Sequence, residues 1–364
     1  MMSEYCIDKR LSDSILTVGE CYWDKVHGGI VSVLKSYKSY FESFNFVASS
    51  RHSVWRDKLR YDLGGLFVMG WRLLWDRNIR IVHIHTAAGG SFDKHIHYAH
   101  LARLMGRKVV MHSHASRFKV WYEELADCHR KRVFSALSKL DCLIVLSQSW
   151  RDYFISIGMD PDRISVLNNI TDRPVGEKIE RAVGDPVRLL FLGEIGPRKG
   201  VFDLLKAMTM IESATPGMAY LEIGGNKMEA ELLDAIQKLH LENCVHFNGF
   251  VSGETKADLL RKTDVFVLPS YNEGLPISIL EAMSYGCAIL STPVGGIPEV
   301  VKDNGILVEP GDVRGIADAI VAVSDSSICQ RMGLVSQETV KAFYPDSVMS
   351  SLRQIYLSLL ESIH

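Results

Sequence analysis

Short apolar runs alternate along this chain with longer segments in which apolar residues recur three and four positions apart. The runs are rich in β-branched and aromatic residues and are bounded by charged residues, glycine or proline, which is typical of buried strands. The longer segments have the spacing of helices that cover a sheet. The predicted strands are residues 14–18, 44–49, 81–85, 108–112, 142–146 and 164–167, then 187–192, 219–223, 245–248, 265–268, 287–291 and 305–308.

The predicted helices separate most of these strands, and a last one follows them. They are residues 30–41, 63–77, 95–105, 121–140, 201–211, 228–239, 256–262, 276–285, 313–323 and 346–364. Strand and helix in alternation predict an α/β protein with parallel sheets covered on both faces. The apolar pattern lapses between residues 168 and 187, which include two prolines and two glycines. We therefore expect a linker at residues 173–186 between domains at 1–172 and 187–345.

Composition narrows the class of protein. The seven cysteines are scattered and form no CxxC pair, so we expect neither a disulfide framework nor a zinc module, and a reducing, cytoplasmic setting fits best. The chain shows no signal-peptide pattern and no apolar run near about 18 residues. A net charge of −2 argues against a nucleic-acid partner.

The charge is unevenly distributed between the two predicted halves. Residues 1–172 carry a net charge of +6 and the remainder −8. The solvated faces of the halves can simply differ, or the basic half can approach an anionic membrane from the cytoplasmic side. The densest basic residues are Arg103, Arg107, Lys108, Arg117, Lys119, Arg130, Lys131 and Arg132.

The stretch from residue 265 to 298 joins a buried strand, two carboxylates and a helix start. Glu273 falls in the loop after the strand, and Pro276 suits the first helical position because it lacks an N–H group. Glu281 then lies inside the helix between two buried strands. A carboxylate in that place needs hydrogen-bond donors, which a hydroxylated ligand would supply.

Two features of the first half also suggest ligands. Gly28 and Gly29 stand between a strand and a helix, where the backbone can approach phosphate, although a tight turn without a ligand is equally compatible. Seven histidines crowd into residues 83–114. They form either a metal site or, as is more usual, satisfied polar groups near the carboxyl ends of parallel strands.

A second loop of the later half carries two cations. Residues 193–200, GEIGPRKG, connect a strand to a helix and include Arg198 and Lys199. Glu273 and Glu281 follow another strand of the same predicted sheet, so all four side chains can reach one crevice. The set suits a diphosphate bound without a metal ion.

These motifs resemble the retaining family-4 glycosyltransferases of GT-B fold. The resemblance rests on Glu273 and Glu281 with seven residues between them, on PRKG at 197–200 and on GILVEPGD at 305–312. It covers the second half strongly and the first half mainly by layout. It implies two Rossmann-like doubly wound domains facing a central cleft, with the last helix crossing back to the first domain.

The resemblance also implies roles in the second half. Glu281 would bind the ribose of a nucleotide, and Glu273 would bind hydroxyls of the donor sugar. The diphosphate would be held by Arg198, Lys199 and the backbone N–H groups of Gly274 and Leu275. Phe250 and Val251 would lie against the base.

In the first half, the resemblance implies that Gly28 and Gly29 approach the diphosphate. His114 is the histidine expected to face the donor sugar, with His112 as the competitor. One departure is Glu194, because the family commonly has arginine there to help bind the diphosphate.

The implied activity is transfer of a sugar from a UDP- or GDP-sugar to a glycan or lipid-linked acceptor, with retention and without a cofactor or metal. Bacterial surface polysaccharide synthesis is the expected setting. A nucleotide-sugar epimerase of the same fold, which needs no acceptor, and a non-enzymatic two-domain binding protein are the alternatives.

Overall fold

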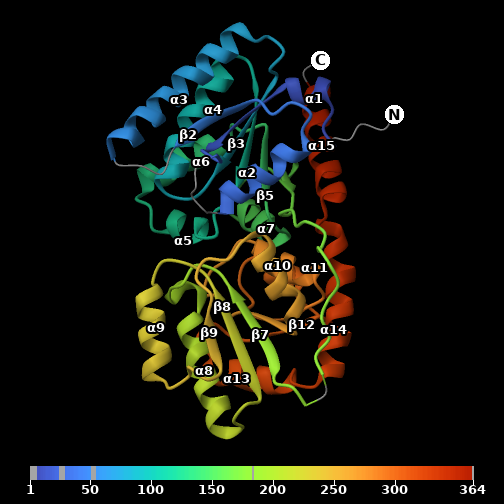
Figure 1. Cartoon of the computed structure of the whole chain (residues 1–364). Helices are drawn as coiled ribbons and strands as arrows, with labels where there is room; N and C mark the ends of the chain where they lie inside the picture. Colours follow the sequence, from blue (N-terminus) through green and yellow to red (C-terminus); the bar gives the residue numbers. More distant parts are fainter. Residues whose placement is uncertain (1–5, 24–28, 51–54, 183, 363–364) are drawn as a thin grey trace. The chain divides into compact units, whose positions relative to one another are not determined.

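The computed structural model describes residues 6–23, 29–50, 55–182 and 184–362, and it divides into two compact units. The first unit comprises residues 1–170 and 345–364, and the second comprises residues 171–344. Each contains one six-stranded parallel sheet with helices on both faces (Figure 1). The predicted α/β class with two doubly wound parallel sheets is therefore confirmed.

The sheet of the first unit has the strand order β2-β1-β3-β4-β5-β6. From β1 the chain adds β2 on one side and β3 to β6 on the other, so the topological switch point lies between β1 and β3. Open parallel sheets bind ligands at such a point, beyond the carboxyl ends of the strands. The strands are β1 (Ile15–Glu20), β2 (Phe46–Ser50), β3 (Ile81–Thr86), β4 (Lys108–Ser113), β5 (Cys142–Val145) and β6 (Ile164–Val166).

The helices of the first unit cover both faces of that sheet. They are α1 (Lys9–Asp13), α2 (Gly29–Tyr40), α3 (Trp55–Trp75), α4 (Gly90–Leu104), α5 (Phe118–Glu123), α6 (Asp127–Leu137), α7 (Gln148–Ser156) and α15 (Pro345–Glu361), with a 3-10 turn at Pro161–Arg163. The helix predicted at residues 121–140 is wrong, because α5 ends at Glu123 and α6 begins at Asp127. The helix predicted at residues 63–77 begins earlier, at Trp55, and α7 is absent from the prediction.

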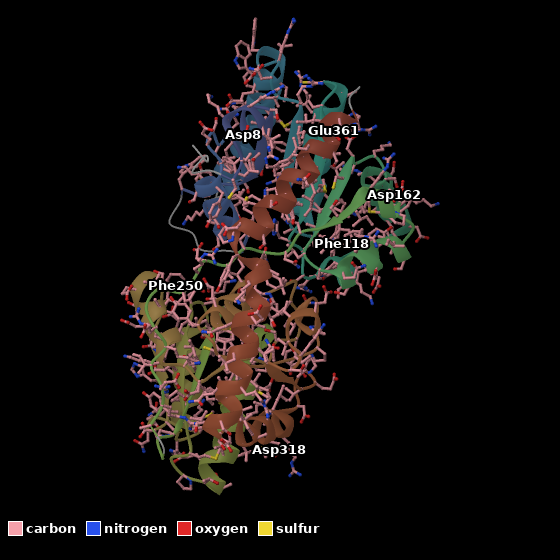
Figure 2. The ribbon with its side chains drawn as sticks, turned by 90° about the vertical axis from the view of Figure 1, so that its right-hand side faces the viewer. Asp8, Phe118, Asp162, Phe250, Asp318 and Glu361 are labelled. Atoms are coloured by element: carbon pink, nitrogen blue, oxygen red, sulfur yellow. The ribbon has the colours of Figure 1, made fainter. Side chains whose placement is uncertain are left out.

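The last helix belongs to the first unit. Val348, Leu352 and Tyr356 lie on one stripe of α15 and are buried, as the apolar spacing predicts. The Tyr356 hydroxyl lies 2.6 Å from Nδ1 of His83 on β3, and Arg353 lies 3.5 Å from Asp8. Figure 2 shows Asp8 beside this helix. The expectation that the chain returns to its first domain is thus confirmed.

The sheet of the second unit has the order β12-β11-β10-β7-β8-β9, so its topological switch point lies between β7 and β10. The strands are β7 (Val187–Leu192), β8 (Ala219–Gly224), β9 (Val245–Phe247), β10 (Val265–Leu268), β11 (Ala288–Ser291) and β12 (Gly305–Leu307). The twelve strands found in the described residues fall where the apolar runs predict them, within two residues at each end.

The helices of the second unit lie between these strands and after them. They are α8 (Val201–Ala214), α9 (Glu229–Lys238), α10 (Gly253–Lys262), α11 (Ile277–Ser284), α12 (Ile297–Val300), α13 (Val313–Ala322) and α14 (Ser326–Thr339), with 3-10 turns at Pro197–Lys199 and Val340–Phe343. Helix α14 has no counterpart in the prediction. No helix of the described chain is both long enough and apolar enough to cross a bilayer.

The segment expected as a linker, residues 173–186, has neither helix nor strand in its described part and lies against the second unit. The amide of Val175 donates to the Tyr285 hydroxyl at 3.1 Å, and that of Ile179 donates to the Arg261 carbonyl at 2.8 Å. These bonds give the two amides the hydrogen-bond partners that a helix or a strand would otherwise provide.

Candidate active site

The loops after β7 and β10 touch each other at the switch point of the second sheet. Gly200 has φ 72°, and a Cβ atom there would lie 2.0 Å from the carbonyl oxygen of Pro269. Only glycine combines this left-handed backbone with so close an approach. The amide of Tyr271 donates to the carbonyl of Arg198 at 2.9 Å, which ties the loops together.

Glu273 is the buried carboxylate of this contact, with 7% of its surface exposed. Its Oε1 accepts hydrogen bonds from Nζ of Lys199 at 2.5 Å and from Oγ of Ser270 at 2.8 Å. Nη1 of Arg198 lies 3.8 Å from the same oxygen and donates to the carbonyl of Asn272 at 3.1 Å. Two cations and a hydroxyl therefore compensate the cost of burying the charge. The structure thus brings together three of the predicted site residues.

Glu194, where the family commonly has arginine, faces two cations. Its Oε2 lies 2.7 Å from Nζ of Lys227 and 3.8 Å from Nη2 of Arg198. Lys227 has φ 89°, which is rare for a residue with a side chain. Sequence reasoning missed Lys227, because it follows β8 and only the adjacency of β7 and β8 brings it to Glu194.

The backbone after Glu273 is fixed by the loop that follows β11. Gly295 has φ 57°, and a Cβ atom there would lie 2.1 Å from the carbonyl oxygen of Glu273. The amide of Gly296 donates to the carbonyl of Gly274 at 2.6 Å, and Leu275 is buried. The prediction for Pro276 is off by one residue, because it precedes the helix as its N-cap, and α11 begins at Ile277.

Glu281 lies on α11, one quarter exposed, and already has a donor from the protein. Its Oε1 accepts from Nζ of Lys256 on α10 at 2.5 Å. The need for hydrogen-bond donors that the sequence indicates is thus met in part by a neighbouring helix, and the role of a ligand as a further donor stays a prediction. Lys256 gave no sequence signal, since the two helices lie on either side of β10 along the chain.

Phe250 and Val251 differ in what they can contact. Phe250 is 44% exposed and lies at the surface of the second unit (Figure 2). Val251 is 9% exposed, and a Cβ atom on Gly224 would lie 2.6 Å from its Cγ2. Phe250 is therefore partly accessible to solvent, whereas Val251 packs against Gly224.

In the first unit, His114 follows β4 and is partly exposed, whereas His112 within the strand is 1% exposed. The ring nitrogens His114 Nε2 and His85 Nδ1 lie 2.9 Å apart. Burial lowers the pKa of His114 to about 3, so its imidazole is neutral at physiological pH. Of the two candidates, only His114 has a side chain that is partly exposed, as contact with a sugar requires. Gly28 lies outside the described residues, and Gly29 is the first residue of α2.

The other crowded histidines are only partly satisfied, which corrects the expectation of ordinary satisfied polar groups. His95 contacts Ser49 and Thr86. Within the described chain, however, neither ring nitrogen of His112 has a hydrogen-bond partner, and Nε2 of both His83 and His85 lacks one. Burial lowers the pKa of each of these rings and keeps them neutral.

Among the described residues, His83, His85 and His112 form a group that could hold a metal ion, since one nitrogen of each lies within 4.8 Å of the others. Neutral imidazole nitrogens are common ligands of zinc, and burial keeps these three rings neutral. The cluster lies in the first unit, whereas Glu273 lies in the second.

Both halves of the chain match family models. Residues 44–169 match the glycosyl transferase 4-like domain, and residues 172–334 match the glycosyl transferases group 1. The fold resembles sucrose-phosphate synthase from Thermosynechococcus elongatus, with a TM-score of 0.78, 19% identity and coverage of 96% of this chain and 100% of that one. It also resembles Anabaena HepE in complex with UDP and glucose, with a TM-score of 0.70, 16% identity and coverage of 95% and 99%.

The two sheets and their structural neighbours thus define a GT-B protein. The chain belongs to the group 1 glycosyltransferases. The amylovoran biosynthesis glycosyltransferase AmsK of Erwinia amylovora is 28% identical over 205 residues, which are 54% of this chain and 50% of AmsK. The chain spans about half the length of the curated relatives that it matches.

Proposed function

We propose that this protein transfers a sugar from a nucleoside diphosphate sugar to a glycan or lipid-linked acceptor in polysaccharide synthesis, with retention of anomeric configuration. The observation that carries the proposal is the buried Glu273 with Lys199 and Arg198 at the switch point of the second sheet. The family membership, the similarity to AmsK and the UDP and glucose bound by HepE support it.

The proposed chemistry follows from where charge develops. As the glycosidic bond to the diphosphate breaks, negative charge grows on the departing phosphate and positive charge on the sugar ring. Fixed cations stabilise the former, and no metal ion is required for that role. In this proposal Arg198 and Lys199 hold the diphosphate with the backbone of Gly274 and Leu275. Lys227 forms an ion pair with Glu194 and so places a cation near the position where the family commonly has arginine.

The remaining residues bind the donor. Glu273 accepts hydrogen bonds from the sugar, and Glu281 accepts from the ribose while Lys256 neutralises its charge. Phe250 lies against the base, and the neutral His114 of the first unit faces the sugar. We also propose peripheral contact with an anionic membrane at its cytoplasmic face, since residues 1–172 carry a net charge of +6.

A panel of UDP- and GDP-sugars, with the nucleotides alone, tests the proposal by thermal shift, because a ligand specific for the folded state raises its stability. We expect one nucleotide series to raise Tm, and the matching labelled sugar to appear in a larger product when a bacterial membrane extract supplies the acceptor. Interconversion of free nucleotide sugars without an acceptor would identify an epimerase instead. No shift with any nucleotide would reject the donor assignment.

A further inference from the structure

The outward face of helix α3 is apolar over its last three turns. Between residues 64 and 75 its exposed positions carry no charge, and they are Gly64, Phe67, Val68, Trp71, Leu74 and Trp75. Trp71 is 57% exposed and Trp75 is 67% exposed, with ring centroids 5.5 Å apart. A surface helix of a globular protein ordinarily presents charged residues to water. This face is therefore built to contact something other than water.

The apolar face of α3 borders a groove against α4. Leu66, Gly70 and Leu74 of α3 and Leu101 of α4 line it, together with Met105, over a volume of about 450 Å³. Leu104 at the end of α4 is 70% exposed beside it. Contiguous exposed apolar patches of this kind mark protein or membrane contacts.

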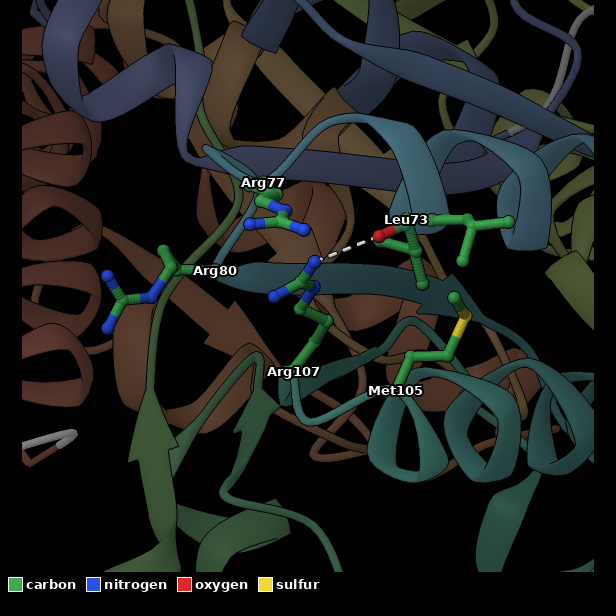
Figure 3. Close-up of a pocket in the computed structure, with 6 residues that line it drawn as sticks. Leu73, Arg77, Arg80, Met105 and Arg107 are labelled. Carbon is green, nitrogen blue, oxygen red and sulfur yellow. Dashed lines mark hydrogen bonds between the residues drawn. The ribbon is translucent and has the colours of Figure 1, made fainter.

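A cationic depression of about 470 Å³ adjoins this groove and shares Leu74 and Met105 with it. Arg77, Arg80 and Arg107 line it from the segments that precede β3 and β4 (Figure 3). In that view the guanidinium groups of Arg77 and Arg107 point toward one another, whereas Arg80 points away.

These arginines lack an anion of their own. Nη2 of Arg107 donates to the carbonyl of Leu73 at 2.9 Å, but its buried Nε has no partner within the described chain. Among the described residues, no carboxylate lies within ion-pair distance of Arg77, Arg80 or Arg107. Asp76, the one acidic residue of segment 72–80, accepts from the amide of Asn78.

The acidic groups of the neighbouring pocket do not neutralise this depression. That pocket includes Asp8, Asp13 and Glu361 beside Arg77 and Arg80. Asp13 is paired with Lys9 at 2.8 Å, and Asp8 lies 3.5 Å from Arg353. Each of the two aspartates is thus paired with another cation. Of the three acidic residues of that pocket, this leaves Glu361 to offset the positive charge of the arginines.

We propose that the face of α3 with the Arg77–Arg107 depression is a docking site for an anionic phospholipid at a bilayer surface. The arginines take the headgroup phosphate, since guanidinium forks bind phosphate. The tryptophans and Phe67 enter the interface, which amphipathic aromatic rings favour. This inference specifies the membrane contact proposed above and does not depend on the transfer chemistry.

The position of the site distinguishes it from acceptor binding. Arg77, Arg80 and Arg107 lie at the amino ends of β3 and β4, whereas His114 follows the carboxyl end of β4. A six-residue strand spans about 20 Å. A lipid held at the amino ends is therefore an anchor rather than the molecule that receives the sugar.

A second copy of the chain is the competing occupant of an apolar face. In a two-fold dimer the same patches meet, which would bring the arginine depressions of two copies close to each other without a carboxylate between them. That repulsion favours an anionic partner. The experiment below separates the two occupants.

The test is sedimentation of the purified protein with vesicles of phosphatidylglycerol or of phosphatidylcholine alone, over a salt series. We expect binding to phosphatidylglycerol that weakens with salt, and a blue shift of tryptophan fluorescence. Trp71→Ser with Trp75→Ser should weaken the binding about tenfold or more, because the interfacial anchors are gone. Arg77→Glu should also weaken it and reduce its salt dependence.

The control is Leu233→Ser with Leu334→Ser, since these side chains are 53% and 68% exposed on the second unit. It should bind vesicles as the unchanged protein does, and all variants should keep their circular dichroism and Tm. Unchanged binding by the tryptophan variant would overturn the site while leaving membrane contact in general intact. Equal binding to phosphatidylcholine, or full competition by millimolar inorganic phosphate, would also overturn it, as would a dimer in light scattering that the tryptophan variant dissociates.

Discussion

At the scale of single residues, the site is organised by carboxylates that already have cationic partners. Glu273 contacts Lys199 and Ser270, Glu281 contacts Lys256, and each carboxylate uses Oε1. A ligand would therefore enter a set of charges that is arranged in advance. Such preorganisation is what stabilises developing charge most effectively.

The first prediction concerns Glu273→Gln, which keeps the shape and removes the charge. We expect the transfer rate to fall about 10²–10⁴-fold, as for a positioned catalytic group, while nucleotide affinity changes little. Transfer of labelled sugar and nucleotide titration measure the two effects. Glu242→Gln, an exposed carboxylate of the same unit, is the control and should behave as the unchanged protein. Full activity of the Glu273 variant would remove this residue from the reaction.

The second prediction concerns Glu281→Ala. It should weaken nucleotide binding by ~1.5–3 kcal/mol, the range for hydrogen bonds to charged groups, because the ribose loses its acceptor. Calorimetric titration with the nucleotide measures the change. Glu254→Ala removes an exposed carboxylate of α10 that pairs with Arg261, and it should leave the affinity unchanged. Equal affinity of the Glu281 variant and the unchanged protein would reject the ribose assignment.

At the scale of elements, strand order decides which loops meet. The loops after β7 and β10 are 74 residues apart at the contact of Lys199 with Glu273, and they touch because the two strands are neighbours. Apolar runs predicted every strand, since burial of a β-branched run is a local property. They could not predict Lys256 or Lys227 as partners, because those contacts depend on which elements lie side by side.

The third prediction compares two glycines that share a left-handed backbone. Gly200 has φ 72° and abuts the Pro269 carbonyl, whereas Gly217 has φ 75° and nothing within 4 Å of its Cβ position. Gly217→Ala should cost only the backbone strain, of about 1 kcal/mol. Gly200→Ala should cost more and also weaken nucleotide binding, because the two loops must separate. Urea unfolding and nucleotide titration check both effects. An equal loss of unfolding free energy in the two variants would show that the loops can separate without a further cost.

At the scale of the whole molecule, the buried titratable groups are unevenly distributed. The fully buried histidines His83, His85, His95 and His112 all belong to the first unit. The histidines of the second unit are His240 and His246, which are both exposed. Protonation of buried imidazoles is therefore a cost that falls on the first unit, because both histidines of the second are exposed.

The fourth prediction is that acid destabilises the first unit before the second. Burial lowers the pKa of His83 and of His95 to about 3, below the ordinary value of 6.5. Their contribution to stability is complete above pH 6.5 and is lost as the pH falls toward 3. At pH 5 each would cost about 2 kcal/mol. Hydrogen exchange at pH 7.5 and 5.0 should show the loss of protection in residues 6–170 and not in 171–344. Uniform loss in both units would contradict the assignment.

By itself the sequence determined the two series of six strands and the last helix, and it singled out the motifs of the proposed site. These follow from local periodicity and from motifs that a single loop contains. Only the tertiary structure decided the partners: Lys199 and Ser270 for Glu273, Lys256 for Glu281, Lys227 for Glu194 and His85 for His114. It also turned the apolar side of α3 outward. The physical reason is that the order of strands and the packing of helices bring distant residues together, and no local pattern encodes that order.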